Sequence, residues 1–328
     1  MIPLSVLDLA MVPDGATSTE AFAQTTAVAQ AAERLGYTRI WVAEHHNMAT
    51  VASTTPAVLM AHLAANTNTI KVGSGGVMLP NHAPLAIAEQ FAMLEALYPG
   101  RVDMGVGRAP GTDGGTAMAL RGARNDPNAE DFPRNLVDVM GLLDDVRNEQ
   151  GLWNRFKATP VATSSPSVIP LGSSGFSAQL AGLLGLPFGF AHHFDMGGTV
   201  EAVEIYRDSF RPSPILDEPY AIVTASTIAA ETTEHANWLA GPALLRRYGL
   251  RTGRIGPMLS PEAAIEHPDF AAASSMTVSS LVGDAAVVVD GMHALVERTG
   301  ADELMLYTST YALEDRLTSL ELIANAWT

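Results

Sequence analysis

Two pairs of histidines have the chemistry to move protons. His45 and His46 follow one apolar run after a single glutamate, Glu44, and His192 and His193 come directly after another run. An imidazole ring accepts or donates a proton near neutral pH, so each pair is a candidate acid or base. The alternative is that these rings only cap or hydrogen-bond a loop, which is the commoner role of a histidine. Neighbouring side chains of an extended chain point in opposite directions, so we expect at most one ring of the first pair to face a central pocket.

We expect no metal at these histidines. Zinc sites on barrel strands often use a His-x-His spacing, which puts both rings on one side of a strand, and this sequence has no such spacing. The chain also has no cysteine, which excludes disulfides, thiolate catalysis, iron–sulfur clusters and zinc held by cysteine.

Glycines and an arginine follow two further apolar runs. Gly73-Ser74-Gly75-Gly76-Val77 can form an ordinary turn, or its glycines can let the backbone approach a flat ligand closely. Arg108 follows the run at 102–106 and offers fixed donors to a phosphate or carboxylate. The alternative for Arg108 is an ion pair with Asp103, Asp113 or another acid.

Another glycine-rich segment, Gly172-Ser173-Ser174-Gly175-Phe176-Ser177, leads into a helical stretch that we expect to begin near Ser177. The free N–H groups and the dipole at the start of a helix favour an anion. A serine in this position also caps a helix. We expect capping here, and phosphate binding in addition is the open alternative.

Composition narrows the class of protein. The 328 residues are 47% hydrophobic and 16% charged, enough for a large core, and the formal net charge is −16. Such a surface repels phosphate backbones, so we expect no nucleic-acid partner. We see no apolar stretch long enough to cross a bilayer and no basic leader, so we expect no membrane association and a cytoplasmic location.

The elements that position these residues alternate between short apolar runs and longer helical patterns, as in a parallel sheet covered by helices. Eight such units predict a single (β/α)8 barrel over residues 1–328; an open six-stranded domain with a second domain is the alternative. The predicted strands are Leu4–Met11, Arg39–Ala43, Ile70–Gly73, Val102–Val106, Ile169–Leu171, Pro187–Ala191, Tyr220–Ala225 and Glu303–Thr308. Long insertions are expected after the fourth strand and, at 251–280, before the eighth; the second is rich in Gly, Pro and Ser and could form a lid.

Taken in order, these motifs resemble the bacterial-luciferase-like family of flavin-dependent monooxygenases. The resemblance covers most of the chain. Its most specific parts are Trp41-Val42-Ala43-Glu44-His45-His46-Asn47, Gly73 to His82, Tyr98-Pro99-Gly100-Arg101-Val102-Asp103, Gly107-Arg108-Ala109-Pro110-Gly111 and Gly172-Ser173-Ser174.

The resemblance implies a cofactor and the residues that bind it. The cofactor would be reduced FMN or, in some branches, F420, held in the mouth of the barrel. The phosphate-binding residues would be Arg108, Ser174, Gly175 and Ser177, with Arg121 or Arg124 as a second cation. The flavin ring would lie against Gly75-Gly76, where luciferase has two alanines joined by a cis peptide. His192 stands where luciferase has a tryptophan near the flavin, so light emission is not expected.

The resemblance also implies the reaction. His45 matches the catalytic histidine of the family, acting beside a flavin C4a-hydroperoxide that forms from O2 and oxygenates a small organic substrate. A separate flavin reductase would supply the reduced FMN, and the protein would be a homodimer. The alternatives are an F420-dependent oxidoreductase that does not use O2, and a flavin-binding protein without turnover. The sequence does not identify the substrate.

Overall fold

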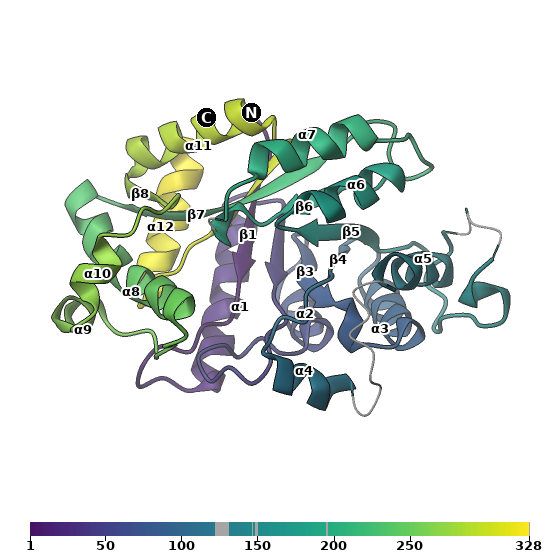
Figure 1. Ribbon diagram of the computed structural model, residues 1–328, viewed down its shortest axis with the longest axis horizontal. Coiled ribbons are helices and arrows are strands. Elements are labelled where there is room, and N and C mark those ends of the chain that lie inside the picture. Colours follow the sequence, from purple (N-terminus) through teal and green to yellow (C-terminus); the bar gives the residue numbers. More distant parts are fainter. Residues whose placement is uncertain (122–130, 146, 148–149, 195, 328) are drawn as a thin grey trace.

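The computed structural model describes residues 1–121, 131–145, 147, 150–194 and 196–327. Eight parallel strands close into a barrel, because β6 pairs with β7 as well as with β5 (Figure 1). The barrel strands are β1 (Leu4–Asp8), β2 (Arg39–Val42), β3 (Lys71–Met78), β4 (Val102–Gly107), β5 (Ser167–Gly172), β6 (Phe188–Phe190), β7 (Ala221–Ala230) and β9 (Glu303–Tyr307). The predicted (β/α)8 barrel is confirmed.

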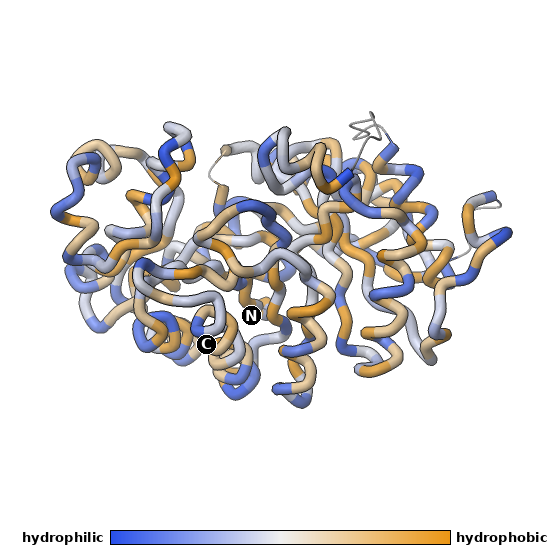
Figure 2. Tube along the Cα trace, turned by 90° about the horizontal axis from the view of Figure 1, so that it is seen from below, coloured by the Kyte–Doolittle hydropathy of each residue, from blue (hydrophilic) through white to orange (hydrophobic). Residues whose placement is uncertain are grey.

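Helices surround this barrel and follow its strands in order. They are α1 (Ser18–Arg34), α2 (Pro56–Ala65), α3 (Pro84–Leu97), α4 (Gly114–Arg121), α5 (Phe132–Leu142), α6 (Gly175–Leu183), α7 (Thr199–Ser209), α8 (Thr233–Thr252), α9 (Pro261–Glu266), α10 (Phe270–Ser274), α11 (Ala285–Thr299) and α12 (Leu313–Ala326). Three short 3-10 helices are η1 (Leu79–Asn81), η2 (Leu152–Asn154) and η3 (His192–Phe194). In Figure 2 the hydrophilic residues gather at the bends around the periphery, and hydrophobic residues run through the interior.

The structure differs from the sequence prediction in several places, among them the first strand, which ends at Asp8 and not at Met11, and the seventh, which continues to Ala230. The third strand does not end at Gly73 but continues to Met78, with a register shift against β4 between Ser74 and Val77. An additional strand, β8 (Leu281–Asp284), pairs with the end of β7 outside the barrel. The helix expected at Ser177 begins at Gly175. Finally, both insertions contain helices: α4 lies in the first, and α9 and α10 lie in the second.

Two layers fill the barrel. The apolar layer consists of Leu7, Trp41, Ile169, Ile222 and Met305. The second is a buried ionic network near the N-terminal ends of the strands. There Arg39 of β2 binds Asp103 of β4 at 2.7 Å and Glu303 of β9 at 2.9 Å. The interior is therefore packed solid, and ligands must bind at the opposite end, where the strands finish.

The two chain termini lie side by side (Figure 1), and the indole Nε1 of Trp327 donates to the Ile2 carbonyl at 3.1 Å. Within the described part of the chain, no helix has the length and apolar character to span a membrane.

Candidate active site

A cavity of about 780 Å³ opens at the mouth of the barrel. Its walls are the loops that follow β1, β2 and β4, together with residues 255–257. The lining residues are Val12, Pro13, Asp14, Gly15, Ala16, His45, His46, Asn47, Met48, Ala49, Thr50, Gly111, Thr112, Asp113, Ile255, Gly256 and Pro257. Part of the insertion at 251–280 therefore lines the same cavity as the predicted catalytic histidine. Met258 anchors this part, because it is buried and its carbonyl accepts from the Asp14 N–H at 2.9 Å.

His45 is held in one orientation from both ends. Its backbone N–H donates to the Ser53 carbonyl, and its ring Nδ1 lies 3.0 Å from the Gly111 carbonyl oxygen. A carbonyl only accepts, so Nδ1 carries the proton and Nε2 of the neutral ring is left with a lone pair. Burial lowers the pKa of His45 and the positive charge of Arg246 lowers it further, against the hydrogen bond to Gly111. The ring is therefore suited to accept a proton at Nε2.

Both histidines of the first pair are among the residues that line the cavity. The strict alternation of side chains ends with β2 at Val42, and Asn47 has a left-handed φ of 54°. The two rings nevertheless have different hydrogen-bond partners, through Nδ1 of His45 and Nε2 of His46. His46 Nε2 lies 3.0 Å from a carboxylate oxygen of Glu44, a buried residue that the sequence analysis did not single out.

Gly75 and Gly76 lie in β3, beside the apolar layer of the barrel, and are joined by a cis peptide bond. A Cβ atom on Gly75 would stand 2.9 Å from Leu7 Cδ1, and one on Gly76 would stand 2.7 Å from the Gly105 carbonyl oxygen. Glycine is needed at Gly76 because the backbone of β4 passes too close for a side chain.

Arg108 and the start of α6 come together, as the phosphate prediction requires. The Arg108 guanidinium lies 4.3 Å from the centre of the Phe176 ring, on the first turn of α6. Ser174 is the N-cap residue, but its side chain makes no capping hydrogen bond, and Ser177 is buried. The expectation that a serine side chain caps this helix is therefore wrong.

The alternative ion pairs of Arg108 do not form. Asp103 binds Arg39 instead, and Asp113 caps α4 through the backbone N–H and hydroxyl of Thr116. In the described ranges no carboxylate pairs with Arg108. A half-buried cation beside uncapped helix N–H groups fits the phosphate of a flavin nucleotide.

The remaining predicted residues lie nearby. His192 Nδ1 is 2.8 Å from the Thr199 hydroxyl at the start of α7. Arg121 Nε donates to Asn81 Oδ1 at 3.2 Å, and Asn81 donates in turn to the Pro110 carbonyl. Arg124 lies outside the described residues.

His193 is the member of the second pair that approaches the barrel axis. Its ring centre lies 5.7 Å from that of Tyr307, at the end of β9, and its carbonyl accepts from Arg247 at 3.1 Å. Burial lowers the pKa of His193 to about 3, with further contributions from Arg247 and from His45. The two histidine pairs therefore meet at one end of the barrel, although His46 and His192 are 146 positions apart in the sequence.

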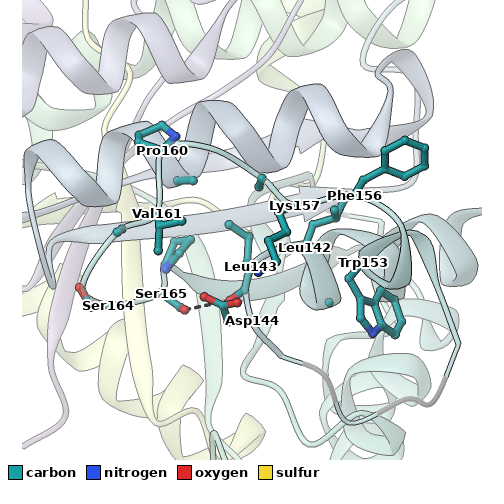
Figure 3. Close-up of a pocket in the computed structure, with 15 residues that line it drawn as sticks. Leu142, Leu143, Asp144, Trp153, Phe156, Lys157, Pro160, Val161, Ser164 and Ser165 are labelled. Carbon is teal, nitrogen blue, oxygen red and sulfur yellow. Dashed lines mark hydrogen bonds between the residues drawn. The ribbon is translucent and has the colours of Figure 1, made fainter.

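A second, smaller cavity of about 210 Å³ lies beside the end of α5, lined by residues that include Leu143, Trp153, Phe156 and Ser165 (Figure 3). The Ser165 hydroxyl donates to the Leu143 carbonyl there at 2.9 Å. These residues precede β5 and so lie toward the opposite end of the barrel, and none is a predicted site residue. In the part of the chain that is described, no three His, Cys, Asp or Glu side chains are arranged to hold a metal ion.

Comparison with known proteins agrees with this geometry. The family model of luciferase-like monooxygenases matches residues 2–303. The chain belongs to the luciferase-like monooxygenase family. A luciferase-like monooxygenase of Escherichia coli (strain K12) is 41% identical over 326 residues, covering 98% of this chain and 96% of the relative. The N-acetyl-S-alkylcysteine monooxygenase of Bacillus subtilis (strain 168) is 32% identical, covering 96% of this chain and 91% of that protein.

Several solved structures share the fold. The crystal structure of apo-MsnO8 has a TM-score of 0.91 at 34% identity, covering 99% of this chain and 98% of that one. The oxygenating constituent of 3,6-diketocamphane monooxygenase, solved with FMN, has a TM-score of 0.73 at 18% identity over 99% and 97%. An F420-dependent secondary alcohol dehydrogenase, solved with an F420–acetone adduct, has a TM-score of 0.64 at 16% identity over 100% and 99%. The fold therefore accommodates either cofactor in its known members.

Proposed function

We propose that this protein is an FMN-dependent monooxygenase that uses O2 to oxygenate a small organic substrate and receives reduced FMN from a separate reductase. The observation that carries the proposal is the pairing of Arg108 with the uncapped start of α6, close to a cavity lined by His45. The loop after β4 joins the two, because Arg108 begins it and the carbonyl of Gly111 holds His45. When bound, FMN supplies the reaction with O2.

The residues of this chain then bind the flavin, orient it and exclude water from it. Arg108 and the N–H groups of α6 hold the phosphate, and the backbone at Gly75 and Gly76 lets a flat ring approach the floor of the mouth. His45 accepts a proton at Nε2. Residues 255–257 cover part of the cavity, which limits the entry of water.

Titration of the purified protein with FMN and with F420, followed by flavin fluorescence, tests the choice of cofactor. Preference for F420 would favour the alternative, a hydride-transferring oxidoreductase. Rapid mixing of the reduced FMN complex with O2 then separates an oxygenase from a protein that merely binds flavin. An oxygenase gives a transient absorbance change before the oxidised flavin spectrum returns, and a binding protein gives direct oxidation. A panel of aldehydes, alkanes, sulfides and terpenoids, supplied with a flavin reductase, identifies the substrate class.

We also propose that two copies pair through α2 and α3. These neighbouring helices expose Val58, Met93 and Leu97, which are 69%, 54% and 60% accessible in the single chain. Exposed large apolar side chains on neighbouring helices are a candidate protein–protein contact. Sedimentation of the wild type as a dimer, and of a Val58→Glu/Met93→Glu variant as a monomer, tests the assignment; a wild-type monomer would contradict it.

A further inference from the structure

Glu44 is a buried carboxylate that joins the loops after β2 and β3. Oε1 lies 3.0 Å from His46 Nε2 and 2.9 Å from His82 Nε2, and Oε2 accepts from the Met78 backbone N–H at 3.0 Å. Burial alone would raise the pKa of Glu44, but the hydrogen bonds from His82, Met78 and His46 outweigh burial and lower it. Glu44 is therefore ionised at neutral pH, and the ring nitrogens that face it carry protons.

A positive charge nearby stabilises an ionised carboxylate that is out of water. Among the described residues no Lys or Arg forms an ion pair with Glu44, and the contacting groups that can become positive are the rings of His46 and His82. One additional proton shared by these two rings would balance the charge.

The two rings on Glu44 differ in their surroundings. His46 lines the cavity, with 17% of its side chain exposed, and 29% of the His82 side chain is exposed. The Nδ1 nitrogen of His46 makes no hydrogen bond to a described residue. Its environment contrasts with that of His45, whose Nδ1 is bonded to the Gly111 carbonyl. Two titratable groups placed in such different surroundings commonly divide the acid and base roles of one site.

We propose that His46 is a second acid–base residue of the cavity, held and charge-balanced by Glu44 and His82. The inference rests on the proposed function. In its acid step, a doubly protonated His46 gives the Nδ1 proton to an oxygen of the substrate. The Nε2 proton stays on the ring, hydrogen-bonded to Glu44, and solvent replaces the Nδ1 proton that has left.

Three other charged or titratable groups bear on His46. Asp113 and His45 line the same cavity. Arg246 of α8 contacts the cavity wall, since it donates to the hydroxyl of Thr50, a lining residue, at 3.1 Å. None of these contacts the Glu44 carboxylate, so the bond between His46 and Glu44 can be tested by itself.

The first test needs no flavin. NMR of the [15N]histidine-labelled protein near neutral pH counts the protons on the two rings beside Glu44. We expect His46 and His82 together to carry one proton more than two neutral rings in the wild type, and to lose it in Glu44→Gln. Glu95 provides the matched control, because it is equally buried and binds the Gly100 N–H at 2.7 Å, away from the mouth. Glu95→Gln should leave the proton in place.

The second test uses turnover with reduced FMN and a substrate from the panel. His46→Gln keeps a donor toward Glu44 but cannot titrate. We expect it to retain its melting temperature, FMN affinity and KM, and to lose about 10²- to 10⁴-fold in kcat. In His46→Gly, added imidazole should restore part of the lost rate, because the cavity can admit it.

Three results would overturn the proposal: two neutral rings beside Glu44 in the wild type, wild-type kcat in His46→Gln, or a loss in His46→Gly that imidazole does not restore. Failure of the proposed function would look different. The wild type would then bind no FMN, while the proton count by NMR could still be as expected.

Discussion

Replacing Arg108 by alanine should weaken binding of FMN but not of riboflavin. The guanidinium is half-buried, stacks on Phe176 at 4.3 Å and has no carboxylate partner in the described chain. Its donors are therefore available to a phosphate. A hydrogen bond to a charged group contributes about 1.5–3 kcal/mol. At about 1.4 kcal/mol per tenfold, we expect the Kd for FMN to rise roughly 10- to 100-fold.

Riboflavin is the matched ligand, because it has the same ring and ribityl chain without the phosphate. Quenching of flavin fluorescence gives both dissociation constants for the wild type and for Arg108→Ala. Arg155 provides a matched control variant, since it also lies over a phenylalanine ring, Phe156, at 5.8 Å, but away from the mouth. Arg155→Ala should change neither constant. An equal loss for the two ligands, or no loss for FMN, would refute the phosphate assignment.

Three further predictions concern other residues. His45→Ala should lower kcat by about 10²- to 10⁴-fold with FMN affinity unchanged, and should remove the acidic limb of the pH–rate profile. That limb should lie below the usual histidine range, since the lowered pKa keeps the basic form present in more acidic solution; a limb that survives in the variant would contradict this role. Gly76→Ala should destabilise the fold by about 1–3 kcal/mol in urea, because the new Cβ would meet the Gly105 carbonyl at 2.7 Å, whereas Gly256→Ala, with open space around it, should have no effect. Burial alone would raise the pKa of Glu33, but hydrogen bonds from three backbone N–H groups (Asn68, Thr69 and Ile70) lower it to about 2. The stabilisation from Glu33 is then complete above about pH 4.5 and is lost as the pH falls toward 2. Glu33→Gln should therefore lower the melting temperature at pH 6 and lower it much less near pH 2. An equal drop at the two pH values would contradict this assignment.

The barrel could be predicted because its strands are short apolar runs bounded by recognisable helix ends. The missing elements gave no such signal. β8 contains only Leu281-Val282-Gly283-Asp284, and its pairing with the end of β7 depends on contacts distant in sequence. α4 begins with Gly114-Gly115, a sequence typical of a loop, and Asp113 caps it through Thr116.

Part of the candidate site followed from position alone. His45 and Arg108 each lie within three residues of the end of a strand, and the ends of parallel strands share one face of a barrel. The partners of these residues could not be predicted in this way. Glu44 meets His82 because η1 turns the chain back after β3, and Arg246 approaches His45 from a helix far along the sequence. Such contacts depend on how loops bend, which apolar periodicity does not specify.

The ionic network at the base of the barrel has a consequence for how this protein can diverge. Arg39 joins three strands, β2, β4 and β9, that are not all neighbours in the sheet. Removing any one of the three charged residues would leave a buried charge unbalanced. At the other end, much of the cavity wall consists of loop residues, such as 12–16, 111–113 and 255–257, which are not part of this network. Mutations that reshape the mouth can therefore accumulate without unfolding the cylinder, so new substrate preferences should arise there, while Arg39, Asp103 and Glu303 tolerate almost no exchange.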